Sequence, residues 1–174
     1  MNAVLETIRS RRSVRRFADK AVPRELIEQV AAAGEWAPTG MNNQTVRLTV
    51  LTDRARIRAL AQEVGRAAYR CADYDFYAPP VFILVSDRQS DVTAPANCAC
   101  ALENMMLAAQ SLGLGSVWIN QMKLVCGDAG VRGQLEAFGV PQDHTVGGCL
   151  ALGYAADAPR DVPRKPGRVV FVED

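Results

Sequence analysis

The sequence predicts an α+β fold in which a layer of helices packs on a mixed sheet. Helical and strand patterns alternate only loosely, and several connections are too short or irregular for a regular series of crossover units. Residues 81–85 form a continuous apolar run, which is typical of an interior strand covered on both faces. A chain of 174 residues that is 49% hydrophobic suits one domain, so we expect a single unit over residues 1–174.

The amino-terminal half begins with two predicted helices. Val4, Leu5 and Ile8 have the spacing of one helical face, so a short helix is expected over residues 2–11. Pro23 marks the start of a second helix, which runs to Trp36 and ends near the breaker at residues 38–40. A strand over residues 46–52 and a helix over residues 54–65 follow.

The carboxy-terminal half contains the longest predicted helix, over residues 95–112, where small and apolar residues recur at spacings of three and four. Gly113 closes this helix. The remaining predictions are a strand over 117–120, a helix over 129–138, a glycine-rich strand over 146–154 and a strand-like apolar pattern over 169–172.

Charge and composition narrow the classes of function. The 20 basic residues are balanced by 19 acidic ones, and the net charge of +1 argues against a nucleic-acid partner. No apolar run is long enough to cross a membrane, and the arginine-rich start does not resemble a signal peptide. The five cysteines are irregularly spaced and do not form a disulfide framework. We therefore expect a cytoplasmic protein with reduced thiols and no membrane partner.

The arginine cluster, residues 9–17, is the most informative segment of the chain. It places five guanidinium groups and two hydroxyls within nine residues. Guanidinium groups bind phosphate bidentately and stay charged at any working pH. The cluster alone fits three interpretations: a solvated helix end, a nucleic-acid patch or the phosphate site of a cofactor.

Two further elements resemble parts of a ligand site, although each has an ordinary structural explanation. The amide loop, residues 37–44, carries three adjacent side-chain amides, which offer donors and acceptors to a polar heterocycle. The turn at residues 113–115 follows the longest helix, and its glycines let a backbone approach a flat ligand closely. Turn chemistry and helix capping explain the same residues without a ligand.

Taken in order, these elements resemble the flavin-dependent nitroreductase family. The resemblance rests on residues 11–17, 23–26, 37–44, 80–87, 104–119 and 152–154 and on the basic pair Arg164 and Lys165. It implies a mainly antiparallel sheet flanked by helices, in an intertwined homodimer that binds FMN at the subunit interface. It also implies that the extension over residues 160–174 packs on the partner subunit.

The same resemblance implies roles for individual residues. Leu114 and Gly115 lie beside the flavin ring, with the Gly115 backbone near N5, and no side chain is catalytic because the flavin carries the hydride. The cofactor-binding residues that it implies are Arg11, Arg12, Ser13, Arg15, Pro38, Thr39, Gly40, Asn42, Gln44, Leu114, Gly115, Arg164 and Lys165. Of these, Pro38, Thr39, Gly40 and Asn42 come from the partner subunit.

Some features depart from the family pattern or stay outside it. Thr45 and Val46 stand where family members often carry Pro-Trp. The aromatic residues between Tyr69 and Tyr77 either wall a substrate pocket, form a surface hairpin or pack in the core. His144 is the single histidine, and no second pair of cysteines is spaced to complete a zinc site with Cys98 and Cys100, so no metal is expected.

The resemblance implies an oxidoreductase that transfers hydride from NAD(P)H, a transient reductant, to a nitroaromatic, quinone or similar small electron acceptor. The absence of a dinucleotide fingerprint agrees with NAD(P)H being a substrate that leaves. Alternatives are a flavin-binding redox sensor or store without efficient turnover, and a reductive dehalogenase-type enzyme on the same scaffold.

Overall fold

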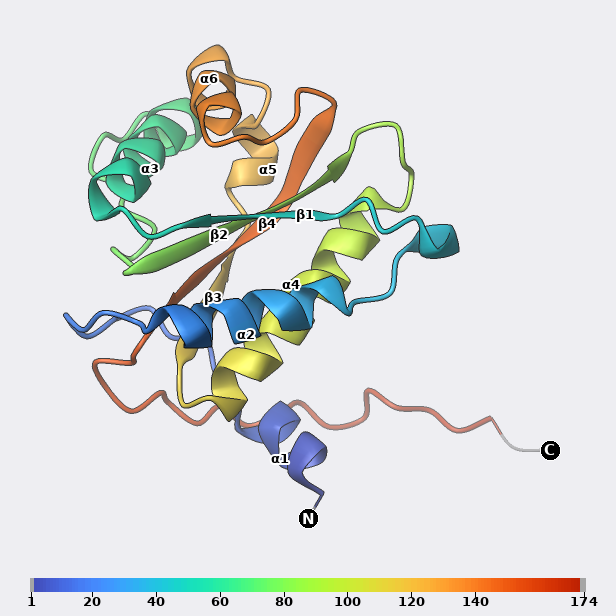
Figure 1. Ribbon diagram of the computed structural model, residues 1–174. Helices are drawn as coiled ribbons and strands as arrows, with labels where there is room; N and C mark the ends of the chain where they lie inside the picture. The colour runs from blue at the N-terminus through green and yellow to red at the C-terminus, as the bar shows by residue number, and fades with distance from the viewer. Residues whose placement is uncertain (1, 173–174) are drawn as a thin grey trace.

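The computed structural model describes residues 2–172 and contains one four-stranded sheet between two layers of helices (Figure 1). The strand order is β1 (Arg47–Leu51), β2 (Val81–Arg88), β4 (His144–Gly153) and β3 (Gly115–Ile119), and every neighbouring pair is antiparallel. Ser13 adds a parallel bridge to Ser116 of β3. The predicted α+β class with a mainly antiparallel sheet is confirmed.

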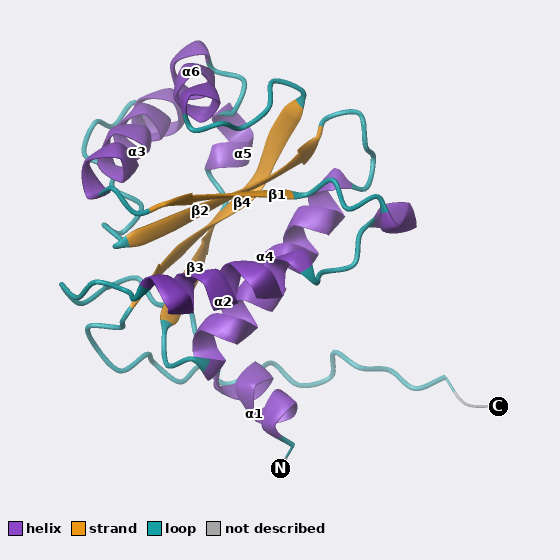
Figure 2. Cartoon of the chain, in the orientation of Figure 1, coloured by secondary structure: helices purple, strands orange, loops and turns teal. Residues whose placement is uncertain are grey.

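The two faces of the sheet are covered by different helices. α2 (Arg24–Glu35) and α4 (Ala94–Ser111) lie on one face, and α3 (Arg54–Tyr69), α5 (Met122–Val125) and α6 (Ala129–Ala137) lie on the other (Figures 1 and 2).

The side chains of β2 alternate between these two cores, as the two-residue period of a strand requires. Phe82 and Leu84 pack toward α3, while Val81, Ile83 and Val85 pack toward α4. All five are almost fully buried. The prediction of an interior strand covered on both faces is confirmed.

Helix α1 (Ala3–Ser10) packs against α4 and leaves much of its apolar face uncovered. The Asn2 side chain caps its first turn by accepting a hydrogen bond from the Val4 N–H. Val4, Leu5 and Ile8 remain about half exposed or more. This unpartnered apolar face lies close to the arginine cluster in the sequence.

The predicted helices and strands up to residue 154 are present, with two differences. α3 continues to Tyr69 instead of stopping at Gly65, because the left-handed residue that ends it is Arg70, with a φ of 55°. Gly65 is instead a packing position, where an added Cβ would lie 2.5 Å from the Cys71 carbonyl oxygen. The four-residue α5 was not predicted, since so short a helix shows no apolar period.

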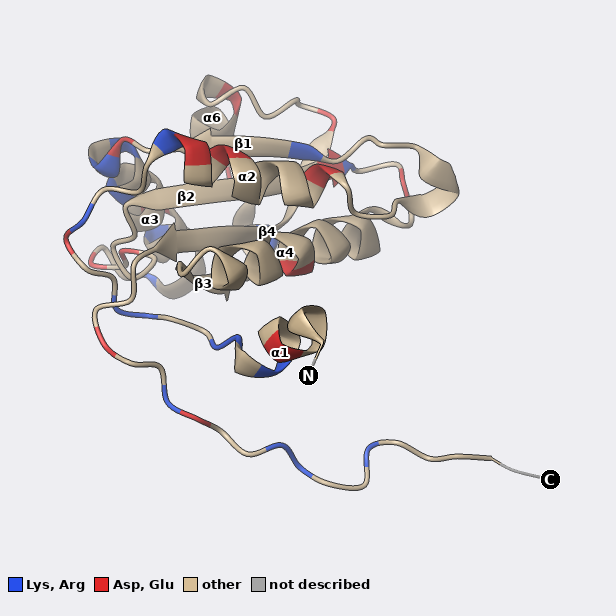
Figure 3. Cartoon of the chain, turned by 60° about the horizontal axis from the view of Figure 1, so that its bottom comes forward, with Lys and Arg blue, Asp and Glu red and all other residues tan. Residues whose placement is uncertain are grey.

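The carboxy-terminal tail, residues 156–172, has no regular secondary structure and is exposed. Figure 3 shows its basic residues spread along a segment that leaves the body of the protein. Residues 169–172 form no strand within the described chain, so the strand pattern is not realised within one subunit. Its pairing with a partner subunit stays a prediction.

Candidate functional site

The arginine cluster is fixed to the edge of the sheet by its backbone. After α1 ends, the Val14 N–H donates to the Ser116 carbonyl oxygen at 3.0 Å, next to the parallel bridge between Ser13 and Ser116. An added Cβ at Gly115 would lie 2.6 Å from Val14 Cγ2. Gly115 is therefore required for the close approach of the cluster to β3, whether or not a ligand also lies against it.

Arginine side chains gather around one cavity beside this bridge. The cavity has a volume of about 390 Å³ and is lined by Arg11, Arg12, Ser13, Arg15, Arg160, Val162 and Arg164. It brings together four of the predicted site residues of the cluster with one from the tail. Lys165 is exposed in the tail and does not line the cavity.

Two guanidinium nitrogens in the cluster lack acceptors. The Nε atoms of Arg11 and Arg12 are buried and have no hydrogen-bond partner among the described residues. The Arg11 Nε is 3.6 Å from a Glu103 carboxylate oxygen, which is too long for a good hydrogen bond. Buried donors without acceptors are costly, so this site favours an anionic or oxygen-rich ligand.

The tail supplies a carboxylate to the same cluster. Arg12 forms an ion pair with Asp161, and the hydrogen bond from Arg12 lowers the pKa of the Asp161 carboxyl below its usual value. Arg16 pairs with Asp157 at 2.7 Å. These exposed pairs hold the start of the tail against the cluster, although each contributes little to stability.

An aromatic segment also reaches the cluster. The Arg15 guanidinium carbon lies 6.0 Å from the centroid of the Tyr77 ring. Phe76 is fully buried and stacks on Phe82, with ring centroids 4.3 Å apart. Phe76 therefore belongs to the core and Tyr77 lies near a predicted site residue, while a role of this segment in a substrate pocket stays a prediction.

Leu114 and Gly115 lie next to the cluster but are themselves buried. Leu114 is 3% exposed and packs in the core between the sheet and α4. Its N–H donates to the Ala109 carbonyl oxygen, and Gly113 has a φ of +72°, as in a common helix C-cap. Contact of Leu114 and Gly115 with a flavin ring stays a prediction, because both residues are buried in one chain and the Leu114 N–H is already hydrogen-bonded.

The amide loop lies at the opposite end of the chain's fold from the arginine cluster. Figures 1 and 3 both place the short 3-10 helix η1 (Gly40–Asn42) beyond one end of α2 and α4, and the cluster at the other end. Pro38, Thr39, Gly40, Asn42 and Gln44 are absent from the lining of the arginine cavity. One chain therefore does not bring the two halves of the predicted site together.

Internal hydrogen bonds shape the amide loop. The Thr39 hydroxyl oxygen accepts from the Gln44 N–H at 3.0 Å, and the Gln44 side-chain amide donates to the Asn42 side-chain oxygen at 3.1 Å. Met41, Asn42 and Gln44 have left-handed φ values of 52°, 56° and 52°. The loop thus presents its amides in a strained backbone conformation.

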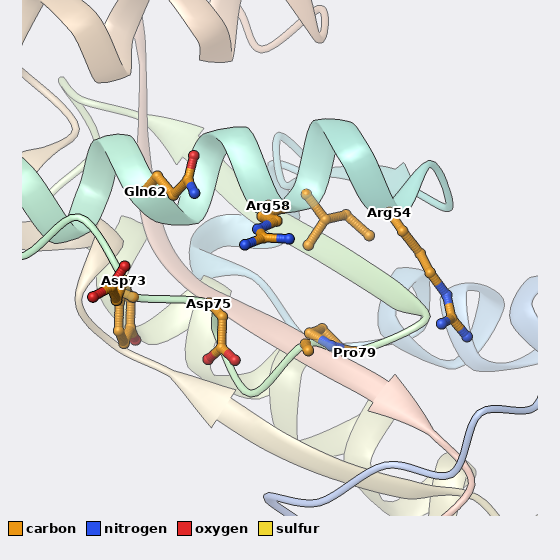
Figure 4. A pocket seen from close by; sticks show the side chains of 9 residues that line it. Arg54, Arg58, Gln62, Asp73, Asp75 and Pro79 are labelled. Carbon is orange, nitrogen blue, oxygen red and sulfur yellow. The ribbon is translucent and has the colours of Figure 1, made fainter.

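A cavity that no sequence pattern predicted lies between α3 and residues 73–79. It has a volume of about 380 Å³ and is lined by Arg54, Ile57, Arg58, Gln62, Asp73, Tyr74, Asp75, Ala78 and Pro79. Figure 4 shows Arg58 extending from α3 into the space above the segment that carries Asp73 and Asp75. Arg54 pairs with Asp19 at 2.8 Å. The cavity therefore lies between α3 and the segment that follows it directly in the sequence.

The histidine and the buried cysteines lie in the core. His144 Nδ1 is 3.2 Å from the Ser86 hydroxyl, and burial lowers the pKa of this imidazole. Burial raises the pKa of Cys98 to about 12 and that of Cys149 well above its usual value, so both thiols are unreactive. No cluster of three or more potential metal ligands occurs in residues 2–172, and no helix there is long and apolar enough to span a membrane.

Comparisons with known proteins agree on one family. The model of the nitroreductase family matches residues 8–154. An NADPH-flavin oxidoreductase from Vibrio harveyi is 29% identical over 188 residues, covering 100% of this chain and 75% of the relative.

Solved structures give the same result. A nitroreductase with bound FMN from Bacteroides fragilis is 36% identical, with a TM-score of 0.93 over 99% of this chain and 100% of that one. A nitroreductase with bound FMN from Desulfitobacterium hafniense is 26% identical, with a TM-score of 0.88 over 99% and 100% of the two chains.

Proposed function

Because the chain belongs to the nitroreductase family, we propose that it is an NAD(P)H-dependent oxidoreductase that holds FMN between two copies of itself. The observation that carries this proposal is the arginine cavity with its two buried, unsatisfied Nε atoms. When bound, FMN takes up hydride from NAD(P)H and passes it to a flat electrophile such as a nitroaromatic or a quinone.

The residues of the arginine cavity fit the polar parts of FMN. Arg11 and Arg12 offer guanidinium donors to the phosphate, and Ser13 offers a hydroxyl to the ribityl chain. Arg15 supplies positive charge for the pyrimidine edge, where it favours the reduced form of the ring. Arg164, with Lys165 next to it in the tail, adds charge on the open side of the phosphate.

The amide loop is proposed to reach the cofactor from the partner subunit. Within one chain this loop and the arginine cluster lie at opposite ends, so two chains are needed to join them. An open apolar groove of about 360 Å³ supports such a dimer; it is lined by Val4, Thr7, Ala33, Trp36, Asn104, Leu107, Ala108 and Ser111. Trp36 is 87% exposed and immediately precedes the amide loop, as expected of a residue that a second subunit covers.

A flavin spectrum tests the proposal most directly. The purified protein should carry or take up FMN and show the visible absorbance band of oxidised flavin. Anaerobic mixing with NADH or NADPH should bleach this band. Failure to bind FMN would overturn the proposal. Bleaching by dithionite but by neither nicotinamide would instead identify a flavin sensor or store.

The role of Arg11 is tested by its alanine variant. Arg11→Ala removes a charge-assisted phosphate contact, so FMN affinity should fall by about 1.5 to 3 kcal/mol, or roughly 10- to 150-fold. Arg24→Ala removes an exposed arginine of α2 outside the site and serves as the matched control. Unchanged FMN affinity in a folded Arg11→Ala protein would contradict the assignment.

Mixing two defective variants tests whether the site is shared between subunits. One variant carries Arg11→Ala with Arg12→Ala, and the other carries Asn42→Ala with Gln44→Ala. A heterodimer has one intact site, so refolding them together at equal amounts should restore about a quarter of the wild-type FMN per subunit. A site contained in one chain predicts no recovery.

The apolar groove is tested by placing a charge in it. Trp36→Glu should yield monomers with weakened FMN binding, measured by light scattering and flavin fluorescence. Leu124→Glu on α5 changes another exposed apolar side chain, on the opposite layer of helices, and should leave both unchanged. A dimeric Trp36→Glu protein with normal FMN affinity would place the interface elsewhere.

A further inference from the structure

A buried carboxyl group ends the central strand without a cationic partner. Asp87 of β2 is 0% exposed, and none of the ion pairs in residues 2–172 involves it. One of its oxygens accepts the Arg88 N–H at 2.8 Å, and the other accepts the Asn97 side-chain amide at 2.9 Å. Burying a carboxyl group is costly unless its oxygens are hydrogen-bonded, and here both oxygens of Asp87 accept hydrogen bonds.

Asn97, in the first turns of α4, joins this carboxyl to the amide loop. It is 3% exposed, and its Nδ2 donates to Asp87 and, at 3.1 Å, to the Thr93 hydroxyl oxygen. Its Oδ1 accepts the Gly40 backbone N–H at 2.9 Å. One buried side chain therefore connects the sheet to the first residue of η1, with each donor facing an acceptor.

The loop beyond Gly40 has few other buried anchors. Its helix η1 contains no buried residue, and Met41 is 96% exposed. A strained backbone persists only where its surroundings hold it, and left-handed backbone is unfavourable for residues other than glycine. Thr93 closes the other side of the contact, because an added Cβ at Gly40 would lie 2.3 Å from the Thr93 hydroxyl oxygen.

We propose that Asp87 and Asn97 are positioning residues of the flavin site, which hold the amide loop in the conformation that binds the cofactor of the partner subunit. The proposal rests on the proposed function, because that function assigns the loop to FMN. Neither residue contacts the cofactor. Asp87 orients the Asn97 amide, and Asn97 fixes the Gly40 N–H.

Asp87→Asn tests the proposal with almost no change in volume. The new amide has one oxygen for two donors, so it turns an NH₂ group toward either the Arg88 N–H or the Asn97 amide. We expect FMN affinity to fall about 10-fold or more, as when a buried polar group loses its partner. Hydrogen exchange of the backbone amides in residues 39–44 should rise in the same variant, measured in the flavin-free full-length protein. Asp73→Asn, at an exposed carboxylate, should change neither quantity.

A reciprocal exchange distinguishes the polar relay, the hydrogen bonds from Asp87 through Asn97 to Gly40, from a general structural role of the carboxyl group. In the double variant Asp87→Asn with Asn97→Asp, the amide at 87 donates to the carboxylate at 97, which still accepts the Gly40 N–H. The Thr93 hydroxyl, which accepts from Asn97 and donates to Asp91 in the wild-type protein, then turns its proton toward the carboxylate at 97. The variant should recover most of the FMN affinity and loop protection that Asp87→Asn loses. A merely structural carboxyl predicts no such recovery.

Each outcome has one meaning. Unchanged loop exchange in Asp87→Asn, or no recovery in the double variant, overturns the positioning role. Faster loop exchange with wild-type FMN affinity also overturns it, because the loop is then not part of the flavin site. A wild-type protein that binds no FMN overturns the proposed function and, with it, the assignment of the loop to a cofactor; loop exchange then reports separately on whether Asp87 holds Gly40.

Discussion

Apart from Arg70 at the carboxy-terminal cap of α3, the described non-glycine residues with left-handed backbone lie in two segments, and different kinds of contact hold the two. The amide loop has Met41, Asn42 and Gln44 in this conformation, and residues 76–78 have three in succession. Hydrogen bonds from a buried polar relay hold the first segment, while aromatic packing holds the second. Hydrogen bonds depend on direction and packing depends on volume, so the two segments should respond to different substitutions.

The aromatic segment owes its place to one side chain. Phe76 is fully buried, stacks on Phe82 with an interplanar angle of 10°, and meets the Tyr74 ring edge-on at 5.2 Å between centroids. The next residue, Tyr77, reaches Arg15 of the cluster. The amide loop is thus itself one predicted half of the flavin site, and the aromatic segment lies beside the other half, at the opposite end of the subunit.

Removing the Phe76 ring should have the largest effect on stability. Phe76→Ala empties a core position and should lower the free energy of unfolding by about 3 to 5 kcal/mol. Urea denaturation measures the loss. Phe76→Leu, which keeps much of the volume, should lose clearly less, and an equal loss in both would show that the ring stacking, not the volume, holds the segment.

Adding one methyl group to the amide loop should have the second-largest effect on stability. In Gly40→Ala the new Cβ meets the Thr93 hydroxyl, so we expect a loss of about 1 to 3 kcal/mol with faster exchange of the loop amides. Gly127→Ala adds the same group where nothing lies within 4 Å. If both variants had equal stability, the contact with Thr93 would not restrain the loop.

Relieving the strain should stabilise either segment by a smaller amount. Met41→Gly and Ala78→Gly replace residues at φ values of 52° and 46° with glycine. Each should raise the free energy of unfolding by about 0.5 to 1 kcal/mol. Ala96→Gly, at an exposed helical position of α4, should instead lose about 1 kcal/mol. Thermal unfolding compares the three, and a loss at both left-handed positions would mean that the strain is absent in solution.

Lowering the pH should reduce the free energy of unfolding through His144, which lies beside the polar relay, and not through the aromatic segment. This is the smallest expected effect. Burial lowers the pKa of His144, which bonds Ser86 beside Asp87; Asp143 and Asp87 raise this pKa, and Arg47 and Arg88 lower it. The folded protein then binds the proton less readily than the unfolded chain. The contribution of neutral His144 to the free energy of unfolding is therefore complete at neutral pH, and it is lost as the pH drops from about 6.5 through the lowered pKa.

Urea denaturation across this pH range measures the effect. His144→Gln removes the titrating group, so its stability should fall less steeply than that of the wild-type protein between pH 7 and the lowered pKa. Phe76→Leu should keep the wild-type pH dependence. A His144→Gln protein that loses as much stability as the wild type would assign the dependence to other groups.

Local patterns predicted most elements but not the contacts that shape the site. The apolar periods of α2 and α4 and the continuous run of β2 lie within single segments of sequence, where periodicity is visible. The relay joins Gly40 to Asn97 across 57 positions, and no local signal reveals it. The left-handed residues were equally hidden, since Met, Phe, Tyr and Ala rarely adopt that conformation. The lining of the arginine cavity was predicted in part: its cluster residues and Arg164 were named from the sequence, while Arg160 and Val162 join it only through the fold.

The bridge between the arginine cluster and β3 also covers part of a sheet edge that could otherwise pair with other chains and aggregate. β3 is an edge strand of the sheet, and unpaired backbone groups on such an edge invite pairing with another chain. Residues 13 and 14 occupy part of this edge, and they place charged arginines on either side of it. A substitution that releases the cluster therefore exposes a pairing surface as well as weakening a binding site, so loss of ligand and aggregation should appear together.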